Sequence, residues 1–143
     1  MCDFHTLDRD KFSEPVTDEK WAKWLRLREE NQGRHHADIA FDFLSRHGFT
    51  ETAETIRLHR STALVEESGA YDSFEKKLVY YSDKRVKHTE IVDLKERFRD
   101  GAERYSRYNT PEQQAVFTEV EQKTHTLEKE LFRGLDIGPS DIR

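Results

Sequence analysis

Apolar residues recur three and four positions apart along most of the chain, the spacing that places side chains on one face of an α-helix. This pattern predicts helices over residues 18–31, 34–48, 50–60, 73–86, 91–108 and 110–133. Gly33, Gly48 and Gly134 end three of them, and Gly48 suits the left-handed position that follows a helix. Residues 1–16 lack a clear period, so we expect an irregular segment or the remnant of a helix there.

The predicted helices carry apolar faces that are expected to point into the protein. In helix 18–31 the face comprises Trp21, Trp24, Leu25 and Arg28. In helix 34–48 it comprises Ile39, Ala40, Phe43, Leu44 and His47. In helix 73–86 it comprises Leu78, Val79, Ser82 and Val86. Phe49 is expected to pack back on helix 34–48. The last helix has the clearest start, because Thr110 can cap it, Pro111 suits its first turn and Gln113 completes a capping box.

Composition supports one helical domain over residues 1–143. The chain is 34% hydrophobic and 37% charged, which is polar, but nine Phe, five Tyr and two Trp supply large groups for a core. Only six Gly and three Pro are present, which favours long helices over a turn-rich β architecture. The expected fold class is therefore all-α, a bundle of about five to six helices.

Charge and hydropathy narrow the set of partners. The formal net charge is −5, and acidic and basic residues are interleaved, so a nucleic-acid partner is not expected. No apolar run is long enough to span a membrane, and the first residues lack the pattern of a signal peptide. We therefore expect a cytoplasmic protein without a membrane partner. The single Cys2 cannot form an internal disulfide, which agrees with a reducing compartment.

Three ionisable residues, His36, His59 and Asp83, fall on faces that should be buried, whereas His35 should point elsewhere. Two neutral imidazoles and a carboxylate suit Fe, Mn, Zn or a similar divalent ion, with positions left for water and a phosphate oxygen. Such an ion would polarise a phosphoryl group and lower the pKa of its bound water enough to yield hydroxide. Alternatively, both histidines are ordinary hydrogen-bonded residues, and Asp83 pairs with Lys84 or Arg85.

Three segments in this order resemble one known family. They are His36–Leu44 with His47–His59, then Leu78–Val86, then Ile91–Phe98. The first is similar to the paired-histidine segment of HD-superfamily metal-dependent phosphohydrolases, in which a histidine opens a helix, a Gly-aromatic turn follows, and the next helix ends in Ile/Val-x-x-His. The second resembles that family's apolar-Tyr-x-Asp-Lys helix. The third resembles the segment that comes after it.

The resemblance implies an HD-domain-like helical bundle with a divalent metal, which could be Fe, Mn, Mg or Zn. It implies that His36, His59 and Asp83 bind the metal or line the phosphate site, with Asp83 and Lys84 as the catalytic residues. The implied substrate is a phosphate ester, that is, a phosphorylated small molecule or a nucleotide.

The start of the chain departs from the family, whose members carry an early histidine and then an adjacent His-Asp pair. Here Cys2-Asp3-Phe4 stands at that place, which leaves Asp3 as a possible fourth ligand in an incomplete shell. The chain would be an N-terminally truncated or degenerate member kept for binding, a chain whose true start lies upstream, or a protein whose site another chain completes. Missing helices would expose core, so a homo-oligomer is also expected. The two competing functions are a phosphohydrolase and a catalytically inactive helical module for oligomerisation or partner binding.

Overall fold

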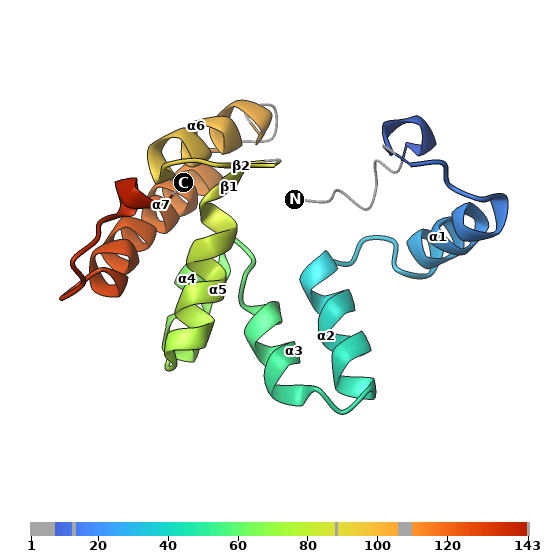
Figure 1. The fold of residues 1–143 in the computed structure, drawn as a ribbon, viewed down its shortest axis with the longest axis horizontal. Helices are drawn as coiled ribbons and strands as arrows, with labels where there is room; N and C mark the ends of the chain where they lie inside the picture. The colour runs from blue at the N-terminus through green and yellow to red at the C-terminus, as the bar shows by residue number, and fades with distance from the viewer. Residues whose placement is uncertain (1–7, 13, 88, 106–109, 143) are drawn as a thin grey trace.

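A computed structural model describes residues 8–12, 14–87, 89–105 and 110–142 of the chain. Within these residues it contains seven α-helices and one short β-hairpin (Figure 1), which confirms the predicted all-α class. The helices are α1 (Asp18–Glu30), α2 (His36–Arg46), α3 (Thr50–Arg57), α4 (Ala63–Glu66), α5 (Phe74–Lys84), α6 (Leu94–Tyr105) and α7 (Pro111–Leu131). The antiparallel hairpin pairs β1 (Val86–Lys87) with β2 (Glu90–Ile91). Single 3-10 turns lie at Arg9–Lys11, Ser68–Ala70 and Pro139–Asp141.

The helix ends follow local sequence signals closely. Thr110 Oγ1 accepts from the Gln113 backbone N–H at 3.3 Å, and Gln113 Oε1 accepts from the Thr110 N–H at 3.0 Å, so the predicted capping box is formed. Thr17 caps α1 by accepting from the Lys20 N–H at 3.3 Å. Gly48 has a φ of 84°, the left-handed conformation expected after α2.

The core lies where α4 and α5 pack against α7, and α6 joins it through the Phe98 ring, whose centroid is 5.6 Å from that of Phe117 on α7 (Figure 1). Its buried residues are Leu58, Ala63, Leu64, Tyr71, Tyr80, Tyr81, Leu94, Phe98, Val120 and Leu127. Tyr80 is fully buried, and its ring meets Tyr71 edge-on at 5.5 Å between centroids. The helical spacing of the sequence places Leu94, Phe98, Ala102 and Tyr105 on one face of α6, and Val116, Val120, Leu127 and Leu131 on one face of α7. Leu94, Phe98, Val120 and Leu127 are buried as expected, whereas Val116 is 36% exposed.

α5 is rotated relative to the face that the sequence predicted. Leu78, Val79, Ser82 and Val86 were expected to be buried, but all four are exposed. Tyr80, Tyr81 and Lys84 are buried instead. The two faces are neighbours on one helix, and burying two tyrosine rings removes more apolar area from water than burying Leu78 and Val79. The tyrosine hydroxyls also find partners, which makes their burial possible.

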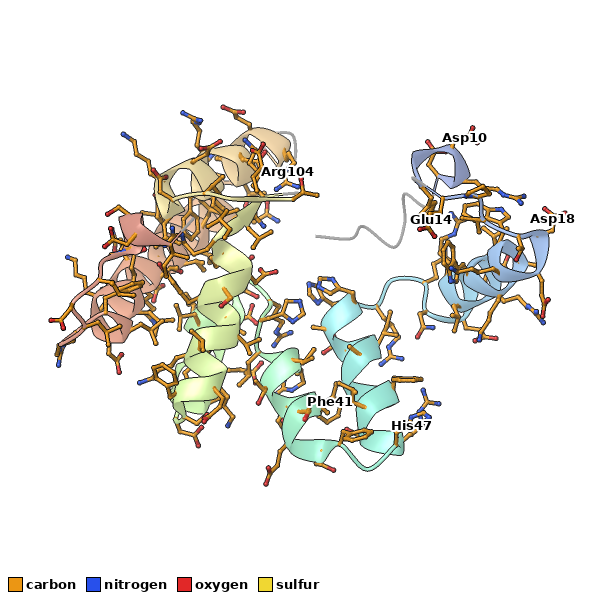
Figure 2. The ribbon with its side chains drawn as sticks, viewed as in Figure 1. Asp10, Glu14, Asp18, Phe41, His47 and Arg104 are labelled. Carbon is orange, nitrogen blue, oxygen red and sulfur yellow. The ribbon has the colours of Figure 1, made fainter. Side chains whose placement is uncertain are left out.

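α2 and α3 form an antiparallel hairpin (Figure 1) that approaches closely through small residues. Ala37 on α2 and Ala53 on α3 are both completely buried. Phe41 lies toward α3, where the Arg57 guanidinium carbon is 5.9 Å from the centre of its ring (Figure 2). Phe43 and Phe49 were expected to pack inward, but they are 55% and 59% exposed. The Phe43 ring packs instead against the ring of His47 at 4.4 Å between centroids, and His47 is exposed although it was expected on the same inward face.

α1 lies apart from the core in Figure 1, and none of its thirteen residues, all of them described, is buried. Trp21, Trp24, Leu25 and Arg28 are its half-buried residues, which are those of the predicted face. The Trp24 ring lies tilted against Phe12 at 5.1 Å between centroids and meets Trp21 edge-on at 6.3 Å. The acidic side chains of Asp10 and Asp18 project from this part of the chain (Figure 2). Across the described ranges, no helix has both the length and the apolar character that a membrane span needs.

Candidate functional site

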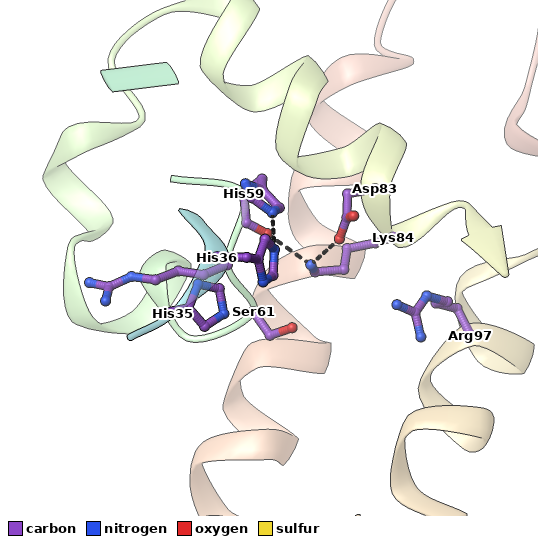
Figure 3. A pocket seen from close by; sticks show the side chains of 8 residues that line it. His35, His36, His59, Ser61, Asp83, Lys84 and Arg97 are labelled. Carbon is purple, nitrogen blue, oxygen red and sulfur yellow. Dashed lines mark hydrogen bonds and ion pairs between the residues drawn. The ribbon is translucent and has the colours of Figure 1, made fainter. Parts of the chain in front are cut away.

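One small pocket gathers the predicted site residues (Figure 3). Its lining comprises His35, His36, His59, Arg60, Ser61, Asp83, Lys84 and Arg97. They come from the start of α2, the segment after α3, the end of α5 and one turn of α6. His36, His59, Asp83 and Lys84 are thus brought together as the sequence predicted. Asp3, the possible fourth ligand, lies outside the described residues.

The pocket is small for a substrate. Its volume is about 20 Å³ as measured by a water-sized sphere, which is room for one or two water molecules or one small ion. A nucleotide therefore cannot enter it whole. Only a terminal group of a larger ligand could reach the side chains that line it.

His36 and His59 bond directly to each other, with 2.7 Å between their Nε2 atoms. His59 Nδ1 also lies against the carbonyl oxygen of Ile56, which can only accept, so this nitrogen carries a proton. In a neutral His59 ring the Nε2 atom is then the acceptor, and His36 Nε2–H donates to it. This assignment occupies both nitrogens of His59 and leaves the lone pair of His36 on Nδ1.

Burial keeps the His36 ring neutral. It lowers the pKa of His36 from 6.5 to about 4, with further lowering by the neighbouring imidazoles of His35 and His59. His35 was expected to point away but lines the pocket, with its ring centre 4.2 Å from that of His36. Its Nδ1 accepts from the Ala37 N–H at 3.1 Å and so caps α2. This capping role could not be predicted, because histidine is not among the usual capping residues.

Lys84, rather than Asp83, is the residue that α5 buries. The Lys84 side chain is 5% exposed, whereas that of Asp83 is 41% exposed. Lys84 Nζ donates to Asp83 Oδ2 at 2.6 Å and to the His59 carbonyl oxygen at 3.0 Å. It also lies 4.8 Å from the centre of the Tyr80 ring. These contacts compensate the buried ammonium group, and they realise the alternative in which Asp83 pairs with Lys84.

The charges of Asp83 and Lys84 stabilise each other. Burial raises the pKa of Asp83, but Lys84, with smaller contributions from His59 and Arg97, more than offsets it, so that the pKa lies below its usual value. Burial also lowers the pKa of Lys84, and the carboxylate of Asp83 opposes this effect. Asp83 therefore remains ionised near neutral pH.

Arg97, on α6, completes the pocket and was not singled out from the sequence. Its side chain is 12% exposed and reaches toward Lys84 (Figure 3). Its Nη1 lies 3.6 Å from Asp100 Oδ2, and its buried Nε has no hydrogen-bond partner among the described residues. The available signal was its position beside Leu94 and Phe98, at the flank of the apolar face of α6.

The residue types suit a divalent ion better than their present arrangement does. A neutral imidazole, a second imidazole and an ionised carboxylate are appropriate ligands. However, no three His, Cys, Asp or Glu side chains in the described ranges lie close enough together to hold an ion. In a tetrahedral site with bonds of about 2.0–2.1 Å, two ring nitrogens lie roughly 3.4 Å apart. The imidazoles are closer than this, at 2.7 Å, and Asp83 is bonded to Lys84.

The low pKa of His36 predicts that the metal-free protein loses stability in mild acid. The folded-state pKa is about 4 and the ordinary value is 6.5, so protonation favours the unfolded chain. The contribution of the neutral His36 ring to the free energy of unfolding is fully present above pH 6.5, and it is lost as the pH drops from 6.5 to 4. Allowing for the partial exposure of the ring, the expected loss is on the order of 1 kcal/mol.

This prediction can be checked by urea denaturation at pH 7 and pH 5 in a chelating buffer. His36→Gln should reduce the difference between the two pH values. His47→Gln, on an exposed ring at the opposite end of α2 (Figure 2), should leave it unchanged. Equal acid losses in the parent and in His36→Gln would contradict the assignment.

The pocket thus combines two bonded imidazoles, an Asp-Lys ion pair and a guanidinium group with an unused donor. Such a set of side chains can bind a small anion. It can bind a divalent metal ion if the Asp83 carboxylate turns away from Lys84. No protein-family model matches the chain, and neither a curated protein nor a solved structure shows significant similarity to it.

Proposed function

We propose that the chain is an HD-type protein whose pocket binds a divalent metal ion and the phosphate group of a phosphate ester, which it hydrolyses. The observation that carries this proposal is the convergence of His36, His59 and Asp83, from three separate elements, on one pocket. Their spacing along the chain does not require them to meet. Lys84 and Arg97 add positive charge at the same place, which suits a phosphate group.

Metal binding requires two local changes. The His36–His59 hydrogen bond must open, and the Asp83 carboxylate must leave Lys84. The second change frees the Lys84 ammonium group for a phosphate oxygen. A bound divalent ion would polarise the phosphoryl group and make its water ligand more acidic. In the overall reaction water adds to phosphorus, the bond from phosphorus to the leaving oxygen breaks, and the leaving alcohol gains a proton.

The volume of the pocket restricts the substrate. Because the pocket has room for only one or two phosphate oxygens, the remainder of a nucleotide or other phosphorylated small molecule would lie outside, over the rim. Selection among substrates would then depend on surface contacts around the opening.

A second candidate is a catalytically inactive helical module. The observation in its favour is that the proposed ligands already satisfy one another: His36 bonds to His59, and Asp83 pairs with Lys84. In that case the cluster is a structural polar network that fixes α2 and α3 against α5. Partner binding or oligomerisation would then be the function.

A metal titration separates the two candidates. The metal proposal predicts that the purified protein takes up one Mn²⁺ or Fe²⁺ per chain, measured by calorimetry and elemental analysis. His36→Ala and Asp83→Ala should each weaken binding by more than the roughly 10–100-fold that loss of an outer-shell partner costs. His47→Ala is the matched control, because His47 is an exposed histidine on the same helix, and it should bind like the parent.

Hydrolysis of bis(p-nitrophenyl) phosphate with added Mn²⁺ then measures turnover. Activity that depends on His36 and Asp83 is the expected result. If the parent binds no stoichiometric metal after reconstitution, the phosphohydrolase proposal fails. Reduced stability of His36→Ala without any metal binding in the parent would favour the inactive module.

A further inference from the structure

We propose that Arg97 and Lys84 form an anion subsite that holds a phosphate group without the help of a metal ion. This inference deepens the proposed function and rests on its phosphate chemistry, but it uses none of the proposed metal ligands. The two side chains come from α6 and α5 and both line the pocket, with the Lys84 ammonium group directed toward His59 and Asp83 (Figure 3).

The balance of charge around these residues leaves a positive excess. Lys84 pairs with Asp83, and Arg97 lies near Asp100. Asp100 is shared, because Arg104 also pairs with it at closer range. The three cations Lys84, Arg97 and Arg104 therefore share the two carboxylates of Asp83 and Asp100. Arg60 also lines the pocket, and Glu66 and Glu67 neutralise its charge, although its buried Nε has no hydrogen-bond partner among the described residues.

Two nearly buried cations that line one pocket repel each other, and here the single carboxylate of Asp83 interacts favourably with both. The Lys84 side chain is almost completely buried, and Arg97 is nearly so. The positive charge of Arg97 contributes to lowering the pKa of Lys84, after the larger effect of burial. A bound phosphate would relieve this repulsion and would bridge α5 and α6.

Arg97 also has an unused hydrogen-bond donor. Its Nε is buried and has no partner in the described part of the chain, while Asp100 lies on the Nη1 side of the guanidinium group. A buried donor without a partner is destabilising, and an oxygen of a bound anion would satisfy it. Guanidinium groups bind phosphate through two parallel N–H bonds, so a lysine could not replace Arg97 fully.

The pocket admits only part of such an anion, and Asp83 limits its affinity. A volume of about 20 Å³ has room for one or two phosphate oxygens, so the rest of the anion would lie in the opening. Asp83 also lines the pocket, and its negative charge repels an anion. Removing that charge should therefore strengthen phosphate binding, although it removes a proposed metal ligand.

The test is binding of inorganic phosphate and of phenyl phosphate to the full chain in the presence of a chelator, measured by calorimetry. Arg97→Leu should weaken binding of both by about tenfold or more, and Arg97→Lys should restore it only in part. Arg99→Leu changes an exposed arginine on the same helix, so it should stay within about twofold of the parent. Asp83→Asn should bind phosphate several-fold more tightly than the parent.

Three results would overturn the subsite: absence of phosphate binding by the parent, equal binding by Arg97→Leu, or weaker binding by Asp83→Asn. If Arg97→Leu does not fold, as judged by circular dichroism, Arg97→Lys and Asp83→Asn decide the outcome. Tighter binding of phenyl phosphate than of phosphate would identify an ester as the ligand, and the reverse would identify the free anion. These measurements are made without metal. The anion subsite can therefore be confirmed even if the metal proposal fails, and it can be contradicted even if the protein binds metal.

Discussion

Tyr80→Ala is expected to destabilise the protein by about 3–5 kcal/mol, the cost typical of removing a large aromatic side chain from a core. Tyr80 is completely buried, packs edge-on against Tyr71 and lies beneath the ammonium group of Lys84. Its hydroxyl lies 3.0 Å from Thr124 Oγ1, and Thr124 in turn donates to the Val120 carbonyl oxygen. Because the Thr124 hydrogen is used in this way, Tyr80 is the donor to Thr124, and the Ser61 carbonyl oxygen, 3.4 Å away, is a longer second acceptor. The substitution removes this bond and leaves a cavity between α5 and α7.

Urea denaturation of three variants checks this expectation. Tyr80→Phe keeps the ring and should cost only about 0.5–1.5 kcal/mol, the usual contribution of one hydrogen bond. Phe74→Ala, on the same helix, is the matched control, because Phe74 is 60% exposed and its loss should matter little. A loss in Tyr80→Ala no larger than that in Phe74→Ala would show that α5 does not bury this face.

Arg85→Ala should have a comparable effect, about 3–5 kcal/mol, the cost of breaking a buried charge pair. The Arg85 Nε donates to the Val92 carbonyl oxygen at 2.6 Å, and Nη2 donates to that of Pro139 at 2.9 Å. Nη1 donates to the Tyr81 hydroxyl and lies 3.7 Å from Glu128 Oε1. One side chain thus connects the hairpin, α7 and the C-terminal turn. The Glu128 side chain is only 16% exposed, and the substitution removes its guanidinium partner.

The loss can be measured by denaturation and located by limited proteolysis. Cleavage within residues 135–142 should become faster, because Arg85 holds the Pro139 carbonyl oxygen. Arg133→Ala removes an exposed arginine near the same turn and should change neither measurement. If Arg85→Ala unfolds at the same urea concentration as Arg133→Ala, the network around Arg85 contributes no net stability.

Local signals in the sequence predicted the helices well, and rotation about a helix axis was harder to predict. Capping at Thr110 and the left-handed turn at Gly48 depend on a few adjacent residues, so the sequence contains them completely. The face of α5 depends instead on what packs against it. Residues 78, 79 and 82 and residues 80, 81 and 84 define adjacent stripes, and only the contacts of Tyr80 and Tyr81 with α7 favour the second.

The hairpin at residues 86–91 was missed for a related reason. The expected helices over 73–86 and 91–108 are shorter in the structure, because the chain turns after Lys84. The turn is held by the Val92 N–H, which donates to the Arg85 carbonyl oxygen at 2.8 Å, and by the side chain of Arg85. Such pairing between residues seven positions apart gives no periodic signal in so short a segment.

Most residues that line the pocket could be predicted from the sequence, but the bonds between them could not. The inward positions of His36 and His59 follow from helical spacing, and the pocket contains both. The exchange of places between Asp83 and Lys84 follows from the rotation of α5, which the sequence pattern left open. Arg97 reaches the pocket only through the packing of α6, so no spacing rule along the chain could relate it to His36.

The residues that line the pocket lie in one part of the sequence, which affects how the protein can change during evolution. The described residues that line the pocket all lie between positions 35 and 97, and α1 supplies none of them. The pocket is therefore encoded in one contiguous stretch, whereas the core beneath it also needs α7. Substitutions within α1 can accumulate, or α1 can be exchanged for another helix, without rebuilding the pocket.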